Sequence, residues 1–294
     1  MTTEEQQAPA GWDDAERIRR WIAGAQQREA QMHPVNDALF AAADLRPGER
    51  VLDVGCGTGP TTLAAAAAVG ATGRVVGTDL SAAMISTARE AADAASSTPT
   101  SGVCAAAVEW VVADAQRYDF GTETYDAVIS RFGVMFFPDP VAAFANLARA
   151  TRPGGRLAAA VWRTRDEVPL FDIPYETATK VLDRLGLPYT PVAIDDNQCS
   201  LGTPATVESV LRPAGWHDVE ITASTGSLYV GGRLSPEEAA RSTLDLGPIR
   251  GVLEGQPDDV RELVRAALEA EYRPRYDGTR VVVPAGFMIV TAQR

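Results

Sequence analysis

Residues 51–62, VLDVGCGTGPTT, decide the fold of this chain of 294 residues. The stretch begins as a short apolar strand, and three glycines then follow at every second position, Gly55, Gly57 and Gly59. Glycine lets the chain turn sharply and lets a ligand approach bare backbone, and the free N–H groups of a following helix can face that ligand. An acid, Asp53, stands two residues before the first glycine. The stretch therefore predicts a ligand-binding turn between a strand and a helix.

Strands and helices alternate around this turn. Apolar residues recur at helical spacing over residues 13–30 and 35–45, ahead of the first strand. Apolar runs that are typical of strands lie at 50–55, 74–80, 108–114, 125–133, 155–163, 216–224 and 285–294. Helical segments separate most of them, and this order predicts an α/β fold: a doubly wound, mostly parallel sheet of seven strands with helices on both faces.

The chain is expected to form a single domain with a cap. Residues 1–45 would form an N-terminal helical lid, residues 46–163 the cofactor-binding α/β core, and residues 164–294 the cap segments together with the last two strands. About sixty residues separate those two strands, and they include two helical stretches. Because simple connections in compact domains are much shorter, this insertion predicts a helical cap over one end of the sheet.

Composition and charge exclude several classes of function. The net charge of −12 disfavours nucleic acid and anionic membranes as partners, so a small molecule is the expected partner. No secretory signal and no membrane-spanning apolar run are visible, which predicts a cytoplasmic protein without a membrane span. Three scattered cysteines and two histidines predict reduced thiols and no metal site.

Three acids narrow the identity of the ligand. No Lys-Ser or Lys-Thr pair ends the glycine loop, which argues against a nucleotide P-loop, and the spacing G-x-G-x-G differs from the dinucleotide pattern G-x-G-x-x-G. Asp53 suits a cationic amine, Asp79 ends the second strand where ribose hydroxyls are bound, and Asp114 ends the third strand. Asp114 could accept from an adenine amino group while the N–H of Ala115 meets a ring nitrogen. An amine, a ribose and an adenine in this order indicate S-adenosylmethionine as the cofactor.

The sequence also resembles a known family. The segments DVGCGTG, VVGTDLS, VVADAQ, YDAVISRFGVMFF and LARATRPGGRL are similar to the successive motifs of class I S-adenosylmethionine-dependent methyltransferases, and they run in order from about residue 45 to 162. The branch it resembles most includes ubiquinone and menaquinone C-methyltransferases and bacterial natural-product methyltransferases. The resemblance implies a Rossmann-like methyltransferase fold. The last third of the chain is similar in general plan only, so the resemblance does not identify a substrate.

The resemblance implies roles for individual residues at the cofactor. Asp53 would lie near the methionine amine, the three glycines would face the methionine part, and Asp79 would bind the ribose. Leu80 and Met84 would border the adenine, and Asp114 would bind its amino group. The backbone carbonyl of Arg131 would lie near the methionine moiety.

The substrate pocket and the catalytic group are less clearly indicated. Methyl transfer needs the acceptor and the methyl group held close and in line, and a catalytic base is optional. His33 is the one histidine placed to act as a base, but a histidine before a proline can equally be a surface or capping residue, and positioning is the favoured mechanism. The candidate pocket residues are Trp21, Phe132, Met135, Phe136, Trp162 and Tyr175.

The function expected from these features is methyl transfer to an oxygen or carbon atom of a small, largely apolar molecule in bacterial secondary metabolism. One alternative is a methyltransferase-like protein that keeps its cofactor as a structural element and catalyses another reaction, such as a cyclisation. A weaker alternative is a nicotinamide-dependent oxidoreductase, which the loop spacing and Asp114 oppose. The sequence leaves the oligomeric state open, and a homodimer is one option.

Overall fold

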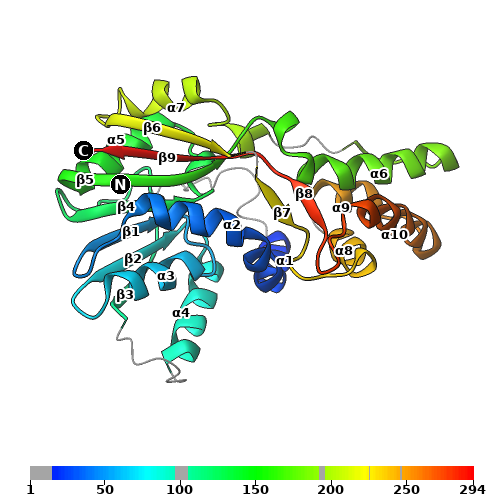
Figure 1. The fold of residues 1–294 in the computed structure, drawn as a ribbon, viewed down its shortest axis with the longest axis horizontal. Helices are drawn as coiled ribbons and strands as arrows, with labels where there is room; N and C mark the ends of the chain where they lie inside the picture. The colour runs from blue at the N-terminus through cyan, green and yellow to red at the C-terminus, as the bar shows by residue number, and fades with distance from the viewer. Residues whose placement is uncertain (1–14, 97–104, 192–195, 225, 246) are drawn as a thin grey trace, which may run out of the picture.

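The computed structural model describes residues 15–96, 105–191, 196–224, 226–245 and 247–294. A seven-stranded sheet in the order β3-β2-β1-β4-β5-β9-β6 is its largest element (Figure 1). Strands β1 to β5 run parallel to one another, and β9 is antiparallel to both β5 and β6. The strands are β1 Arg50–Val54, β2 Arg74–Asp79, β3 Ala107–Val112, β4 Tyr125–Arg131, β5 Thr151–Trp162, β6 His217–Ser224 and β9 Phe287–Gln293. The mostly parallel seven-stranded sheet predicted from the sequence is confirmed.

The strand order reverses at β1. The chain moves outward from β1 through β2 to β3, then returns to pair β4 on the other side of β1. In open α/β sheets a ligand crevice lies at the carboxyl ends of the strands where the order reverses. The glycine loop lies at this point, between β1 and helix α3 (Pro60–Val69).

Helices cover the sheet and account for its apolar strands. Tyr125 to Ser130 of β4 are all buried, as expected for a central parallel strand covered on both faces. Helix α3 contacts β1, β2 and β3, and α5 contacts β5 and α7. The covering helices after β1 are α3, α4 (Ala82–Ser96), α5 (Pro140–Ala150) and α7 (Pro204–Leu211), and short 3₁₀ turns lie at η1 (Val134–Phe136), η2 (Arg165–Glu167), η3 (Asp196–Cys199) and η4 (Arg273–Arg275).

The N-terminal helices differ from the sequence prediction in where they break. The sequence places a break between residues 30 and 35, before or at Pro34. In the structure α1 (Ala15–Ala23) ends at Gly24, and α2 (Ala25–Ala43) continues through Pro34. Three buried side chains beyond the proline, Val35, Leu39 and Ala43, pack α2 onto the core, and this burial outweighs the single backbone hydrogen bond that proline removes. Residues 1–14 of the expected lid are outside the described residues.

A second lobe lies beyond the carboxyl ends of the parallel strands, at the right of Figure 1. It is built from α6 (Pro169–Leu185), α8 (Pro236–Thr243), α9 (Gly247–Leu253) and α10 (Asp258–Tyr272). The sequence analysis did not predict its two short strands, β7 (Ser227–Tyr229) and β8 (Val282–Pro284), which pair antiparallel. The division of the chain at residues 45 and 163 stays a prediction.

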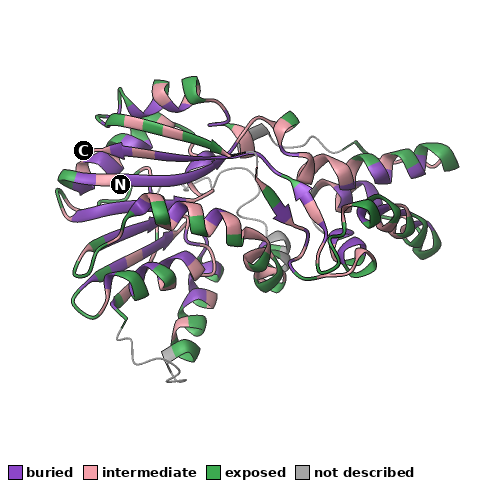
Figure 2. Ribbon diagram, in the orientation of Figure 1, coloured by how far each residue is buried: buried purple, intermediate pink, exposed green. Residues whose placement is uncertain are grey.

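Each lobe has its own hydrophobic core. Figure 2 shows buried segments along the sheet and on the inner sides of the helices in the second lobe, whereas the outer sides of α6 and α10 are exposed. In the second lobe Leu182, Leu253, Val264 and Leu268 have no more than trace exposure, and the hydroxyl of buried Tyr272 lies 3.3 Å from that of Thr243. A lobe with a separate core can keep its own shape when the other lobe moves.

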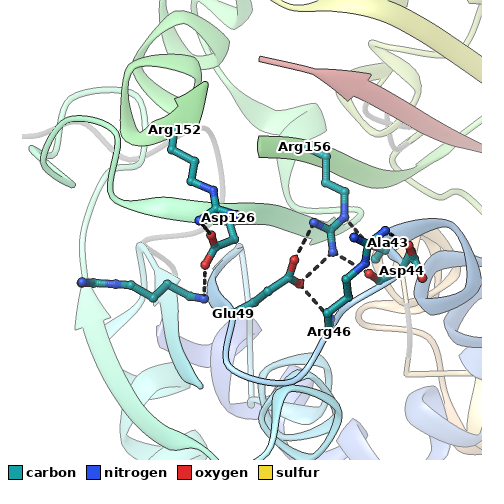
Figure 3. Close-up of polar contacts among 8 residues, drawn as sticks. Ala43, Asp44, Arg46, Glu49, Asp126, Arg152 and Arg156 are labelled. Carbon is teal, nitrogen blue, oxygen red and sulfur yellow. Dashed lines mark hydrogen bonds and ion pairs between the residues drawn. The ribbon is translucent and has the colours of Figure 1, made fainter. Parts of the chain in front are cut away.

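Arg156 fixes α2 to the sheet at the amino ends of the strands (Figure 3). Its Nη1 and Nη2 donate to the two carboxylate oxygens of Glu49 at 2.9 and 2.8 Å. Its Nε and Nη2 also donate to the backbone carbonyls of Ala43 and Asp44, at 2.5 and 2.6 Å. Beside this group Asp126 accepts from the backbone N–H of Arg50 at 2.6 Å and pairs with Arg152. These contacts satisfy the last carbonyls of α2 and leave the carboxyl ends of the strands free for a site.

Candidate functional site

The glycine loop forms a tight turn at the carboxyl end of β1. The N–H groups of Gly55 and Cys56 both donate to the carbonyl of Thr78, at 2.8 and 3.0 Å, which ties the loop to the end of β2. Gly55, Gly57 and Gly59 have φ values of 70°, 55° and 92°, in the left-handed region that side chains rarely adopt. All three predicted glycines therefore lie where the backbone conformation favours glycine.

The three glycines differ in what surrounds them. A Cβ at Gly55 would lie 2.6 Å from the Cα of Gly133, and one at Gly59 would lie 2.6 Å from the ring of Trp110. These two glycines allow close packing within the protein. A Cβ at Gly57 would meet no described atom within 4 Å, so the loop is open at Gly57 and a ligand can approach the backbone there.

Asp53 is completely buried beneath the loop. Its Oδ2 accepts hydrogen bonds from the hydroxyls of Thr61 and Thr62, both at 2.6 Å. Its buried Oδ1 has no hydrogen-bond partner. Burial raises the pKa of Asp53 to about 6, although the two hydroxyls and the charge of Arg131 act in the opposite direction. An unpaired oxygen on a buried carboxylate is the kind of group that a cation would satisfy.

Asp79 supports the loop from the end of β2. Its two oxygens accept from the backbone N–H groups of Gly57 and Ser81, each at 2.9 Å. Burial raises the pKa of Asp79, and the backbone hydrogen bonds oppose this shift. Each carboxylate oxygen can accept a second hydrogen bond, so Asp79 can bind ligand hydroxyls and hold the loop at the same time.

The residues predicted to surround an adenine lie at the ends of β2 and β3. Asp114 accepts from the N–H of Gln116 at 2.9 Å and lies 3.5 Å from Arg117, with a fifth of its side chain exposed. Ala115 is buried and Leu80 is half-buried. Met84 is 1% exposed and belongs to the packing beneath α4, so little of it is open to a ligand.

Arg131, at the end of β4, carries a network that the sequence analysis missed. Its Nη1 donates to Oδ1 of Asn36 at 2.6 Å and to Oε1 of Glu29 at 3.0 Å, and its Nη2 lies 2.7 Å from Oε2 of Glu29. Asn36 in turn donates to Oε1 of Glu29 at 2.6 Å. The seven-residue spacing of Glu29 and Asn36, which puts them on one side of a continuous helix, is the signal that could have found them. The network joins α2 to the strand beside the glycine loop.

An aromatic cluster follows β4 and β5. The rings of Phe132 and Trp162 are stacked, with centroids 3.9 Å apart and planes 6° from parallel, and Phe171 meets Trp162 edge-on at 5.3 Å. Phe132 has a φ of 62°, which is a strained conformation for a bulky residue. Its N–H donates to the carbonyl of Ala160 at 2.9 Å and holds it there. Two predicted pocket residues, Phe132 and Trp162, are therefore together at the carboxyl ends of the strands.

The other predicted pocket residues lie in different surroundings. Met135 is 2% exposed, and its sulfur accepts the N–H of Trp162 at 3.3 Å. Phe136 packs half-buried against the main core, whereas Tyr175 packs against the core of the second lobe. Trp21 is 40% exposed and lies against the guanidinium of Arg28. Met135 therefore acts as packing beneath the aromatic cluster.

His33 lies on the outer side of α2. Its side chain is 73% exposed, and its Nδ1 lies 3.1 Å from the carboxylate of Asp37, one turn further along the helix. A base must come within hydrogen-bond reach of the proton that it removes, so a catalytic role for His33 would need an acceptor at this exposed surface. That role stays a prediction.

The expected cofactor fits the residues present in two respects. The unpaired Oδ1 of Asp53 matches a cationic amine, and the open backbone at Gly57 gives the close approach that glycine permits. Within the described ranges, no group of three or more His, Cys, Asp or Glu side chains could hold a metal ion. No helix in the described part of the chain is both long and apolar enough to cross a membrane.

The chain is similar to known methyltransferases. Residues 51–155 match the protein family described as "Methyltransferase domain". An uncharacterized protein of Mycobacterium tuberculosis is 40% identical over 144 residues, 48% of either chain. The ubiquinone/menaquinone biosynthesis C-methyltransferase UbiE of Francisella tularensis is 27% identical over 195 residues, 64% of this chain and 75% of that enzyme.

This chain spans about half the length of the first curated relatives it matches. Among solved structures, the cyclase SpnF superposes with a TM-score of 0.51 at 19% identity, covering 89% of this chain and 80% of that one. At this identity the likeness shows the fold alone.

Proposed function

We propose that this chain, whose residues 51–155 match the methyltransferase domain family, is a class I S-adenosylmethionine-dependent methyltransferase that transfers a methyl group to a small molecule. The acceptor atom would be an oxygen or a carbon of a largely apolar compound. The setting we propose is bacterial secondary metabolism, in which the natural-product methyltransferases that the sequence resembles act.

The observation that carries this proposal is the buried carboxylate beneath an open glycine loop. Asp53 has one oxygen without a partner, and Gly57 above the switch point has no protein atom where a side chain would be. A pyrophosphate would be repelled by that carboxylate, whereas the ammonium of a methionine moiety would neutralise it. Asp79 and Asp114 supply acceptors for a ribose and an adenine at the next two strands.

The protein would act mainly by positioning. When bound, S-adenosylmethionine supplies an electrophilic methyl group. The cofactor would be held by Asp53, Gly57 and Asp79. The apolar surface of the stacked Phe132 and Trp162 rings would orient the methyl acceptor and exclude water. Holding two reactants in line can contribute about 7–11 kcal/mol in favourable intramolecular cases. An exposed His33 would at most assist, because its side chain already faces solvent and Asp37.

Calorimetry tests the cofactor assignment directly. S-adenosylhomocysteine, the demethylated product, should bind to the purified chain, and NAD should not. Binding of NAD alone would overturn the assignment in favour of an oxidoreductase. Incubation with S-adenosylmethionine and candidate phenols or activated carbon acids should then give S-adenosylhomocysteine and a product heavier by one methylene. Cofactor binding without any consumption would point to another reaction on the same fold.

A further inference from the structure

The turn after β4 is tied to β1 by the hydroxyl of Ser130. Ser130 is completely buried, and its Oγ donates to the backbone carbonyl of Val54 at 2.8 Å. The same Oγ accepts the backbone N–H of Gly133 at 3.2 Å. One hydroxyl therefore connects residues 130–133 to the last residue of β1, directly before the glycine loop.

The backbones of these two segments are also in direct contact. A Cβ at Gly133 would lie 2.5 Å from the carbonyl oxygen of Val54 and 2.8 Å from the Cα of Gly55. A Cβ at Gly55 would lie 2.6 Å from the Cα of Gly133. Because a side chain would not fit at either position, glycine at both allows this packing. Segments packed so closely transmit displacement to each other, so the glycine loop sets the place of Gly133.

Phe132 lies inside this turn in a strained conformation. Its φ of 62° is in the left-handed region, which a bulky side chain adopts only where the surrounding structure holds it there. The hydroxyl of Ser130 holds the backbone on the far side of Phe132, through the N–H of Gly133. The N–H of Phe132 itself donates to the carbonyl of Ala160 at 2.9 Å. In this conformation the Phe132 ring lies flat on that of Trp162, with centroids 3.9 Å apart.

We propose that Ser130 is a positioning residue for methyl transfer. Its hydroxyl fixes the Phe132 ring, and with it the apolar surface for the methyl acceptor, at a set place relative to the glycine loop. This rests on the proposed function, in which that loop holds the methyl donor and the Phe132 ring borders the acceptor. The loop itself has a separate support, since the N–H groups of Gly55 and Cys56 donate to the carbonyl of Thr78. Loss of the Ser130 hydroxyl should therefore displace the acceptor surface and leave the cofactor site intact.

Fluorine NMR reports the position of the Phe132 ring without cofactor or acceptor. The chain has five tryptophans, and labelling with 5-fluorotryptophan gives a resonance for each of them. Trp162→Phe identifies the resonance of Trp162, and Phe132→Ala shows where this resonance lies without the stacked ring. In Ser130→Ala the Trp162 resonance should move from its wild-type position toward that in Phe132→Ala.

Two variants complete the comparison. Thr151→Val removes a buried hydroxyl that also donates to a backbone carbonyl, that of Leu147 at 2.8 Å, but at the amino end of β5. This control should keep the Trp162 resonance at its wild-type position. Ser130→Cys keeps the shape of the side chain, but a thiol is a weaker donor and acceptor, so the resonance should move in the same direction by a smaller amount.

Calorimetry and turnover separate positioning from a general loss of structure. Ser130→Ala should bind S-adenosylhomocysteine as tightly as the wild-type chain does. Its turnover on the acceptor that the screen of phenols and carbon acids identifies should fall about 10- to 100-fold, because the acceptor is no longer held in line.

Three results would overturn the proposal: a Trp162 resonance that stays at its wild-type position in both Ser130 variants, unchanged turnover although the resonance has moved, or unfolding of both variants. If Ser130→Ala alone unfolds, the resonance in Ser130→Cys decides. A wild-type chain that neither binds S-adenosylhomocysteine nor methylates any acceptor would instead count against the proposed function, and the fluorine spectra would still show whether Ser130 positions Phe132.

Discussion

The carboxylate of Glu29 lies 2.7 Å from the guanidinium of Arg131, although 102 residues separate them in the sequence. The Arg131 side chain is 15% exposed, and that of Glu29 is 34% exposed, so the pair is partly shielded from solvent. It is the polar link between helix α2 and the strand that ends beside the glycine loop. Removal of the Glu29–Arg131 ion pair should therefore lower the stability of the fold and disturb the site beside the glycine loop.

Glu29→Ala should lower the free energy of unfolding by about 1–3 kcal/mol, since it leaves a half-buried guanidinium whose remaining hydrogen bond among the described residues is to Asn36. Urea denaturation measures the loss. Glu176→Ala is the matched control, because Glu176 pairs with Lys180 at a well-exposed position on α6, where solvent screens the pair and its contribution to stability is small. Equal losses in the two variants would show that the Arg131 network has no special role.

Substitutions at two of the glycines should have different effects. Gly55→Ala should destabilise the fold strongly, because its Cβ would lie 2.6 Å from the backbone of Gly133. Gly57→Ala meets no protein atom, so it should cost only about 1–2 kcal/mol for its left-handed φ, yet weaken binding of S-adenosylhomocysteine roughly 10-fold or more. Thermal unfolding and calorimetry on both variants separate the effects. Wild-type affinity in Gly57→Ala would mean that the ligand does not approach there.

The pH dependence of stability should reveal Asp53. Its pKa of about 6 in the folded chain lies above the usual value of 3.8, so between these values the folded state holds a proton that the unfolded state releases. The contribution of Asp53 to stability is therefore present below pH 3.8 and is lost as pH rises through 6, by on the order of 2–3 kcal/mol.

Asp53→Asn removes this buried charge and keeps an acceptor for Thr61 and Thr62. The variant should be more stable than the wild-type chain at pH 7–8 and about equally stable near pH 4. It should also bind S-adenosylhomocysteine more weakly, because an amide does not neutralise an ammonium. Denaturant unfolding across this pH range, with calorimetry at pH 7.5, measures both effects, and a variant that binds as tightly as the wild-type chain would remove Asp53 from the site.

Asp79→Ala should weaken binding of S-adenosylhomocysteine by about 1.5–3 kcal/mol, the range for hydrogen bonds to a charged group. The variant would lose the proposed acceptor for ribose hydroxyls and also the support of the Gly57 N–H. Asp119→Ala, at an exposed acid that pairs with Arg149, is the control and should bind normally. Unchanged affinity in Asp79→Ala would contradict the assignment.

His33→Ala should keep most of its methyl-transfer activity, because the exposed imidazole pairs with Asp37 on the outer side of α2. Loss of a true base would lower turnover about 10²- to 10⁴-fold. Phe132→Ala should cost more, since it removes the ring stacked on Trp162. Turnover, measured as S-adenosylhomocysteine formation, decides between a catalytic base and catalysis by positioning. A large loss of turnover in His33→Ala, together with a histidine-like pH profile, would show that His33 is a catalytic base.

The sequence was enough to predict the fold because the alternation of strands and helices around residues 51–62 is a local pattern. The strands β7 and β8 were missed because three-residue segments carry no periodicity. The path of α2 through Pro34 was also missed, since the burial of Val35 and Leu39 that holds it together is a tertiary effect.

The candidate site was predictable only in part. The acids and glycines of the cofactor loop follow from spacing along the chain. The spacing of Glu29 and Asn36 places them on one side of a helix, but their pairing with Arg131, about a hundred residues away, could not be predicted from the sequence. In the same way, the packing of Gly55 on Gly133 and of Gly59 on Trp110 depends on which segments the fold brings together.

Helix α2 is held at several points. Arg156 binds the carbonyls at its last turn, Arg131 binds Asn36 and Glu29, and Gly232 of the second lobe packs against Ala30. These contacts make α2 a rigid connection between the two lobes. Helix α1 is joined to α2 at Gly24 and rests against α4, and the Trp21 ring beside Arg28 ties the two N-terminal helices together.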